Sequence, residues 1–274
     1  MSPGTASRPR GRLSHRPRRG AHASPPRIAQ PSRNRPILAI IEGMPKGVAA
    51  TSTRTEFVFP AGDRRLSGLL DPAAKPRALC VLAHGAGNDM RNPLFEGVVR
   101  GLAEGDVSTM RFNFPFTEEG RRGPDRPPVL LEAWRGALGE AERRSGGLPR
   151  VAAGKSLGGR MASMLAAEDP AGFFCAAIVF FGYPLHAPGR ANQPRDSHLP
   201  SVGVPMLFIQ GTSDPLADLG LIRTLVDRLA PRAELHLVDG GDHSFRVRGA
   251  RRADEEIGRE LGSVAAEFVR GVVG

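Results

Sequence analysis

Residues 149–170 read PRVAAGKSLGGRMASMLAAEDP, and this stretch decides the fold. A short apolar run leads into Gly154-Lys155-Ser156-Leu157-Gly158, and a helical pattern rich in Ala, Met and Leu follows. Glycines flank a serine in this way where a strand turns sharply into a helix, because larger side chains would collide with the reversing backbone. Such a turn exposes the serine hydroxyl, so the stretch predicts that Ser156 is a nucleophile.

Two other interpretations of this turn are open to test on the sequence. The GKS of residues 154–156 also occurs in phosphate-binding loops, whose pattern G-x-x-x-x-G-K-[ST] requires a glycine at position 149. Pro149 stands there, which excludes this kind of nucleotide site. A glycine-rich turn with an incidental serine remains as the structural alternative.

A nucleophilic serine needs a histidine to take its proton and a carboxylate to orient that histidine. Asp214 follows the strand-like run VPMLFIQ, and His243 follows AELHLV. Both positions are loops after strands, where an open α/β sheet gathers its functional groups. We therefore expect Ser156, Asp214 and His243 to form a catalytic triad. The alternatives are that Asp214 caps the following helix, with Pro215 at its first position, and that His243 is an ordinary loop histidine.

The tetrahedral intermediate of acyl transfer needs two N–H donors aimed at its oxyanion. The N–H of Leu157, directly after the nucleophile, supplies one in this arrangement. The second is expected from the loop His84-Gly85-Ala86-Gly87, whose small residues let the backbone approach a substrate. We assign it to the N–H of Ala86 and expect His84 to be structural. A flexible turn without this role is the alternative for the loop.

Short apolar runs alternate with longer helical patterns from residue 54 onward, which predicts an α/β fold with a mostly parallel sheet of eight strands flanked by helices on both faces. The first two strands have no helical pattern between them and should form an antiparallel edge. The expected strands are 55–59, 66–70, 78–83, 107–112, 149–153, 175–181, 204–210 and 234–238, and the expected helices are 94–104, 129–144, 157–168, 217–230 and 253–271.

These motifs resemble the α/β-hydrolase superfamily, in which the order Ser156, Asp214, His243 is typical. The small, dienelactone-hydrolase-like branch is the nearest resemblance. Within it, HGAG, RFNFPF and AGKSLGGRMAS are similar to the Tex/KANL-type hydrolase-like domain, and the resemblance spans about residues 54–272. Dienelactone hydrolases typically carry a cysteine nucleophile, whereas this chain has Ser156, which argues against dienelactone chemistry.

Several features bear on the substrate. Only about 22 residues separate the strands ending near Phe181 and beginning near Val204, which predicts a minimal cap and an open site. The 16-residue loop 113–128 is expected over the site, with Phe114 and Phe116 lining an acyl pocket. Nearby cations either favour an anionic substrate or form a solvated rim; they are Arg121, Arg122, Arg126, Lys155 and Arg160.

The net charge of +10 is concentrated at the start of the chain, where residues 1–50 hold nine arginines and Lys46 against Glu42. This segment has few apolar residues, so we expect residues 1–50 to be a disordered basic arm and residues 51–274 to be the hydrolase domain. Three interpretations of the arm stay open: a translation start at Met44 instead, a nucleic-acid or acidic-membrane contact, and a targeting signal. No aromatic is interleaved with the arginines, which argues against nucleic acid.

The composition fits one globular domain, with 40% hydrophobic and 24% charged residues. Cys80 and Cys175 lie in apolar runs, so we expect no disulfide framework or metal site and a cytoplasmic setting. No apolar stretch approaches the roughly 20 residues that span a bilayer. The sequence thus predicts a serine hydrolase that cleaves an ester or related acyl bond of a small molecule without any cofactor. A non-catalytic hydrolase-like interaction module is the alternative.

Overall fold

The computed structural model describes residues 53–274, whose eight strands form one sheet in the order β1-β2-β4-β3-β5-β6-β7-β8. β1 and β2 pair antiparallel, β2 pairs antiparallel with β4, and every later pairing is parallel. The predicted antiparallel edge and parallel portion are confirmed, while the predicted arm lies outside the described residues. The strands are β1 Thr55–Ala61, β2 Arg64–Asp71, β3 Ala78–Ala83, β4 Val107–Phe112, β5 Arg150–Lys155, β6 Ala177–Phe181, β7 Met206–Gly211 and β8 Ala233–Val238.

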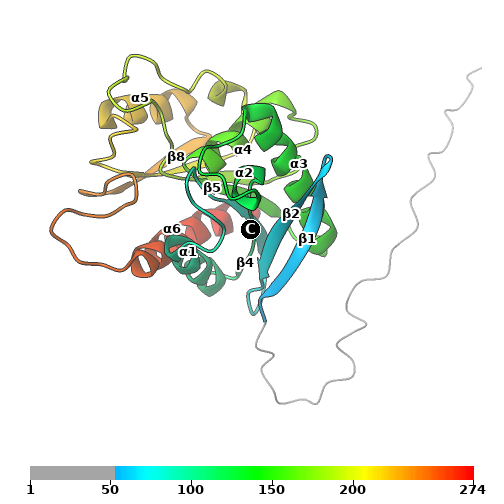
Figure 1. Ribbon diagram of the computed structural model, residues 1–274. Coiled ribbons are helices and arrows are strands. Elements are labelled where there is room, and N and C mark those ends of the chain that lie inside the picture. Colours follow the sequence, from blue (N-terminus) through cyan, green and yellow to red (C-terminus); the bar gives the residue numbers. More distant parts are fainter. Residues whose placement is uncertain (1–52) are drawn as a thin grey trace, which may run out of the picture. The chain divides into compact units, whose positions relative to one another are not determined.

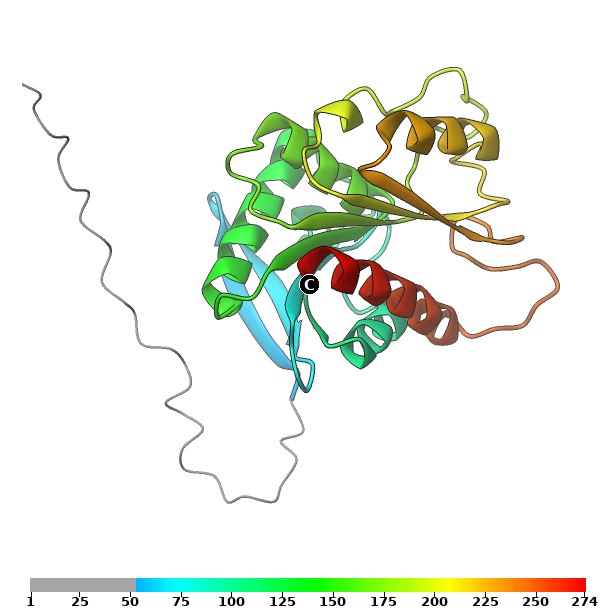
Figure 2. The same cartoon turned by 180° about the vertical axis from the view of Figure 1, so that it is seen from behind.

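Helices cover both faces of the sheet. α1 and α6 lie on one face, and α3, α4 and α5 lie on the other (Figures 1 and 2). Each face buries its own hydrophobic cluster against the sheet, as expected of parallel strands whose side chains are apolar on both sides. The helices are α1 Pro93–Glu104, α2 Pro115–Glu118, α3 Pro127–Arg144, α4 Leu157–Glu168, α5 Leu219–Leu229 and α6 Asp254–Val273, with the 3₁₀ turn η2 Leu199–Ser201.

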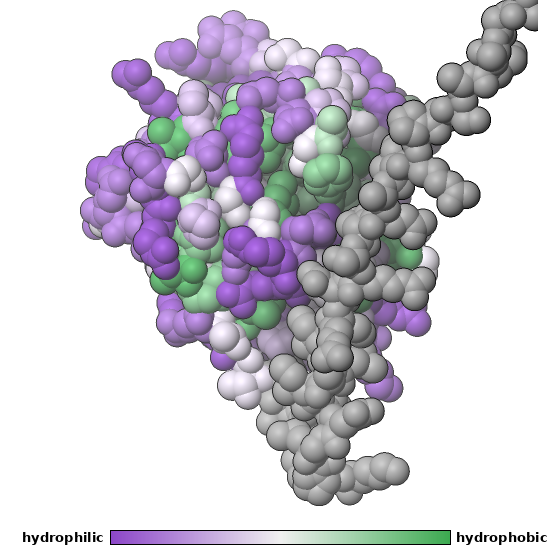
Figure 3. Space-filling view, turned by 90° about the vertical axis from the view of Figure 1, so that its right-hand side faces the viewer, coloured by the Kyte–Doolittle hydropathy of each residue, from purple (hydrophilic) through white to green (hydrophobic). Residues whose placement is uncertain are grey.

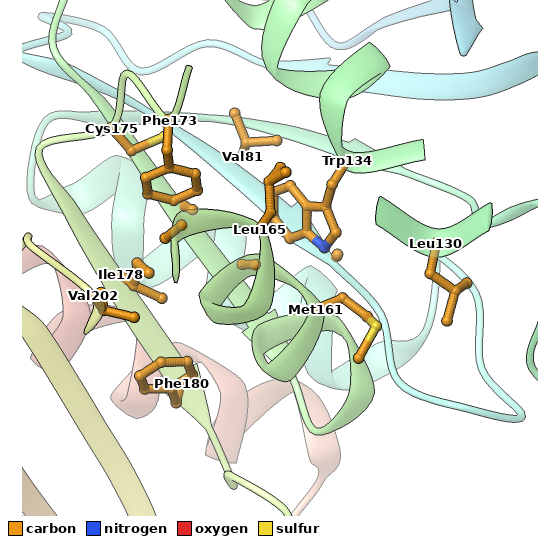
Figure 4. Packing of buried hydrophobic residues seen from close by; sticks show 14 of the residues in the cluster. Val81, Leu130, Trp134, Met161, Leu165, Phe173, Cys175, Ile178, Phe180 and Val202 are labelled. Atoms are coloured by element: carbon orange, nitrogen blue, oxygen red, sulfur yellow. The ribbon is translucent and has the colours of Figure 1, made fainter. Parts of the chain in front are cut away.

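The larger of the two hydrophobic clusters lies on the face covered by α3, α4 and α5. Trp134 of α3 connects this cluster to the turn at Ser156. Its ring is fully buried beside Met161 and Leu165 of α4 (Figure 4). Its indole Nε1–H donates to the carbonyl of Gly158, at 3.1 Å, in the first turn of α4. A buried indole N–H needs such a partner, so the core both packs against α4 and fixes the position where that helix begins.

A buried arginine connects the antiparallel edge to α1. Arg111 of β4 is fully buried, and its guanidinium donates to Asp71 of β2 and to Glu96 of α1, each at 2.9 Å. Arg54 completes the network, with its Nε 2.5 Å from Asp71 and its Nη2 2.6 Å from Glu96. Two carboxylates thus neutralise two guanidinium groups, which a buried charge requires.

Glycines bring α1 and α6 into direct backbone contact. A Cβ on Gly97 or Gly101 of α1 would collide with the backbone of α6, at the carbonyls of Glu255 and Arg259. In the same way, a Cβ on Gly258 or Gly262 of α6 would collide with the carbonyl of Leu94 or Val98 in α1. Only glycine permits this approach of two helices, so the interface depends on a G-x-x-x-G spacing in each of them.

The surface of the described domain mixes both kinds of residue. Hydrophilic residues are interspersed with smaller hydrophobic areas on the face shown in Figure 3. The large hydrophobic side chains exposed within residues 53–274 are Val58, Phe174, Leu221 and Val247. In this part of the chain no helix has the length and apolar character that crossing a membrane demands.

Candidate active site

Ser156 stands alone between β5 and α4 in a strained backbone conformation. Its φ is 51° and its ψ is −113°, a region that non-glycine residues rarely adopt. Its N–H donates to the carbonyl of Phe181 at 3.1 Å, which ties the turn to β6. A Cβ on Gly154 or Gly158 would collide with neighbouring backbone, as the sequence predicted for such a turn.

Two loops bring His243 and Asp214 to the serine. Asp214 follows β7 and His243 follows β8, so both lie beyond the carboxyl ends of the sheet strands. The Nε2 of His243 lies 2.9 Å from the Ser156 Oγ, and its Nδ1 lies 2.7 Å from Oδ2 of Asp214. The Asp214 side chain is fully buried, whereas 24% of the His243 side chain is exposed. One continuous chain of hydrogen bonds therefore runs from a buried carboxylate to a half-buried hydroxyl.

The buried carboxylate of Asp214, at the interior end of these hydrogen bonds, has a further partner that the sequence did not reveal. Gln210, the penultimate residue of β7, is fully buried and donates from Nε2 to Oδ2 of Asp214 at 2.5 Å. The other carboxylate oxygen accepts from the N–H of Leu216 at 2.8 Å. The one signal for Gln210 was a polar residue in an otherwise apolar strand, four positions before the aspartate. Asp214 does not cap the next helix, because Asp218 is the N-cap of α5.

The loop after β3 lies beside the serine. A Cβ on Gly85 would be 3.5 Å from the Cβ of Ser156, so the backbone of this loop approaches the nucleophile directly. No hydrogen bond within residues 53–274 uses the N–H of Ala86 or of Leu157 as its donor. Both groups predicted to hold an oxyanion thus have no acceptor in the described protein.

The buried side chain of His84 holds the loop after β3 through two hydrogen bonds. It is fully buried, its Nδ1–H donates to the carbonyl of Gly85 at 2.8 Å, and its Nε2 accepts the N–H of Phe114 at 3.0 Å. Burial lowers the pKa of His84 to about 4, which keeps the ring neutral as this pair of bonds requires. The expectation that His84 is structural agrees with these contacts.

The prediction that Phe114 and Phe116 line an acyl pocket is wrong. Both side chains are fully buried in the larger core cluster. Their rings pack against His84 with centroid separations of 5.1 and 5.5 Å, and they stack on each other at 6.0 Å. The short helix α2 turns the two residues inward, so they support the loop after β3 and have no surface to offer a substrate.

The predicted cations have different surroundings. Arg121 is exposed and pairs with Glu119 and Asp125, which makes it part of a solvated rim. Lys155 is only 7% exposed, although it immediately precedes the nucleophile. Burial lowers its pKa to about 8, against the raising effect of Asp214 and Asp242. No ion pair or hydrogen bond of the described residues includes its ammonium group.

Two further histidines, His186 and His198, form hydrogen bonds within the protein. His186 accepts the N–H of Asp218 at 2.9 Å, and His198 lies 2.8 Å from the Ser163 hydroxyl.

Between the strands flanking residues 182–205 the chain forms only the single turn η2, in agreement with the predicted minimal cap. No group of three or more His, Cys, Asp or Glu side chains among residues 53–274 is arranged to hold a metal ion.

Known proteins share a sequence pattern and the fold with this chain. The model of a family described as "Alpha/beta hydrolase domain" matches residues 76–271. A dienelactone hydrolase from Anabaena variabilis is similar in structure, with a TM-score of 0.64 and 22% identity, over 80% of this chain and 98% of that chain.

Two further solved structures share the fold. The esterase domain of a Rhodothermus marinus protein gives a TM-score of 0.62 at 17% identity, over 81% of this chain and 100% of that chain. A serine hydrolase without a lid from Xanthomonas campestris gives a TM-score of 0.60 at 17% identity, over 82% of this chain and 97% of that chain. At these identities the likeness is one of fold.

Proposed function

Because the chain belongs to the alpha/beta hydrolase domain family, we propose that it is a serine hydrolase of carboxylesterase type, cleaving a carboxylic ester or a related acyl bond. The observation that carries this proposal is the pair of hydrogen bonds that joins Ser156, His243 and Asp214, at 2.9 and 2.7 Å. Their chain order is that of the α/β-hydrolases. The strained turn at the half-buried Ser156 adds support, since strain of this kind is concentrated at functional sites.

In the proposed first half-reaction, the Ser156 Oγ attacks the acyl carbon while His243 Nε2 takes the hydroxyl proton. The carbonyl electron pair moves onto oxygen, and the N–H groups of Leu157 and Ala86 donate to that oxyanion. The intermediate then collapses, the bond to the alcohol oxygen breaks, and His243 returns its proton to the leaving alcohol. An ester joins the substrate acyl group to Ser156.

In the second half-reaction, His243 takes a proton from water, whose oxygen attacks the acyl-enzyme. Collapse of this intermediate releases the acid and returns the proton to Ser156. Asp214 remains an anion throughout, holding the Nδ1–H tautomer of His243 and stabilising its cationic form. This chemistry needs neither a metal nor an organic cofactor.

Covalent labelling tests the proposal. Treatment of the full chain with a fluorophosphonate, followed by intact-mass measurement, should give a single adduct on the wild type and none on Ser156→Ala. Ser213→Ala is the matched control, because Ser213 is an exposed serine next to Asp214 and should leave the adduct unchanged. A folded wild type without an adduct would overturn the proposal and favour the alternative, a hydrolase-like module that binds a partner.

We also propose that residues 51–274 contain the whole catalytic machinery. A chain that begins at Met44 keeps Arg54 and its ion pairs to Asp71 and Glu96. It should give the same adduct at the same rate as the full chain. A slower reaction of a folded short chain would assign part of the site to the residues removed.

A cytoplasmic setting is proposed on the state of the cysteines. Cys80 and Cys175 are both free and buried. Burial raises the pKa of Cys175 to about 12 and that of Cys80 further, so both thiols are protonated and unreactive at neutral pH. Free thiols without a disulfide are typical of reducing compartments.

A further inference from the structure

A small pocket lies between the loop after β3, the start of α1 and the segment that follows His243, and its lining includes Lys155, the residue before the serine. Its volume is about 110 Å³, and its lining residues include Gly85, Leu94, Lys155, Ser244, Arg246 and Asp254. We call it the Lys155 pocket. Three of these residues adjoin the proposed machinery, because Lys155 precedes Ser156, Ser244 follows His243, and Gly85 precedes Ala86.

The ammonium group of Lys155 is the unusual feature of this pocket. Its residue is more than nine-tenths buried, yet no ion pair or hydrogen bond of the described chain includes it. Its Nζ lies 5.7 Å from the ring centroid of Phe245. A Cβ placed on Gly182 would be 3.2 Å from this Nζ and 3.5 Å from Nδ1 of His243, which brings the two nitrogens within about 7 Å. A buried charge without a partner is costly unless a ligand supplies one.

The carboxylates around Lys155 already have donors. Asp214 holds His243 and Gln210, as described above. Asp242 accepts the N–H groups of Ser244 and Arg246. Asp254 forms a bidentate pair with the guanidinium of Arg246, at 2.9 and 2.7 Å, so these two lining charges cancel. The ammonium of Lys155 is therefore the charged group of the pocket that has no hydrogen bond or ion pair among the described residues, although Asp214 and Asp242 attract it through space.

The first turn of α1 adds to the positive potential. Asn92, Pro93 and Leu94 line the pocket, and Asn92 is the N-cap of this 12-residue helix. The N-terminus of a helix carries a partial positive charge that favours anions. The buried residue Lys155 and the N-terminus of α1 therefore line the same small cavity.

We propose that the Lys155 pocket binds a carboxylate of the substrate, so that the enzyme prefers short esters that carry a free carboxylate. This inference rests on the proposed hydrolase function. The size of the cavity selects a small group, because sites for drug-sized ligands measure about 300–1,000 Å³. Lys155 is then a specificity-determining residue, and its place next to Ser156 sets a short span between the carboxylate and the ester.

Binding without turnover tests the inference separately from catalysis. The full-length Ser156→Ala variant is titrated in a calorimeter with monomethyl glutarate, which carries a free carboxylate. A second titration with dimethyl glutarate, which carries none, gives the comparison. We expect at least tenfold tighter binding of the acid, with the difference lost in Ser156→Ala/Lys155→Met. Ser156→Ala/Lys75→Met is the matched control, because Lys75 is an exposed lysine and should leave the preference intact.

Kinetics of the wild type provides the second readout. Monomethyl esters of succinate, glutarate and adipate should show kcat/KM values at least tenfold above those of the dimethyl esters, and Lys155→Met should abolish this preference by lowering the values for the acids alone. Equal binding and equal kcat/KM for acid and neutral esters would overturn the carboxylate site while leaving the hydrolase intact. Lys155-dependent binding of inorganic phosphate without any preference for the acid ester would overturn it as well.

The two proposals fail in different ways. Lys155-dependent binding of the acid ester to Ser156→Ala, combined with no turnover and no fluorophosphonate adduct on the wild type, would support the carboxylate site and overturn the hydrolase. Folding of the Lys155→Met variants is expected, because methionine replaces a buried charge with an apolar side chain of similar length.

Discussion

The amide of Gln210 and the carboxylate of Asp214 meet inside the molecule, with Gln210 Nε2 2.5 Å from Asp214 Oδ2. The same oxygen accepts from His243 Nδ1 at 2.7 Å. Gln210 lies within the rigid strand β7, whereas Asp214 lies in the loop beyond it. The strand therefore fixes the carboxylate oxygen that orients the histidine, and Gln210 is a positioning residue of the proposed site.

Replacing Gln210 by leucine should lower kcat about tenfold with little change in KM, since one hydrogen bond that orients the aspartate is lost. Esterase kinetics would measure this. In an Asp214→Ala background the same change should have no further effect on kcat, because Gln210 acts through that carboxylate. Gln193→Leu, in an exposed segment, is the control. Additive losses in the double variant would contradict the positioning role.

Replacing Lys155 by methionine should stabilise the protein at pH 7. The folded pKa of about 8 is below the ordinary value of 10.5, so between these values the unfolded chain holds a proton that the folded chain lacks. The cost of the buried charge is thus fully present below pH 8 and is relieved as the pH rises toward 10.5. Denaturant unfolding should show a gain of roughly 2–3 kcal/mol at pH 7 that shrinks toward pH 10. Lys75→Met should show no such trend.

Replacing His84 by glutamine should change the acid sensitivity of the fold. The folded pKa of about 4 is below the ordinary value of 6.5, so the wild type loses stability as the pH falls from 6.5 to 4. Glutamine has an oxygen for the Phe114 N–H but does not titrate. The stability difference between wild type and variant should narrow by roughly 2–3 kcal/mol over this range. A stability difference that does not change with pH would refute the lowered pKa of His84. The control is His236→Gln, because His236 is exposed.

Replacing Gly101 by alanine should destabilise the protein by about 2 kcal/mol or more, because the new methyl group would collide with the carbonyl of Arg259 in α6. Thermal and denaturant unfolding would measure the loss. Gly139→Ala is the matched control, since Gly139 is an exposed helical glycine of α3 with open space around an added Cβ. That change should stabilise by about 0.5–1 kcal/mol. A neutral Gly101→Ala would refute the close contact.

Much of the fold followed from the sequence because its signals are local. The strands 78–83 and 107–112 and the helix 157–168 have the predicted bounds, since each is a continuous apolar or helical pattern with clear ends. The helix predicted at 217–230 begins later, at Leu219, because the side chain of Asp218 caps it. The predicted loop 113–128 contains α2, whose four residues are too few to show a period.

The candidate site was predictable where chain order and loop position carried the information, as for Ser156, Asp214 and His243. It was not predictable where only packing decides. Phe114 and Phe116 have the same apolar character in a core as on a pocket wall, so their composition did not distinguish the two. Gln210 and the facing glycines of α1 and α6 acquire meaning only through residues distant in the sequence.

The backbone contact of α1 with α6 lies close to the proposed site, because Leu94, whose carbonyl packs on Gly258, also lines the Lys155 pocket. The loop with Ala86 leads into α1, and the loop with His243 leads into α6. Because the two helix backbones are in direct contact at these glycines, neither helix can slide or rotate without a steric clash. The packed helix pair therefore fixes where both loops end, and so constrains the distance between Ala86 and His243, the proposed oxyanion donor and proton carrier.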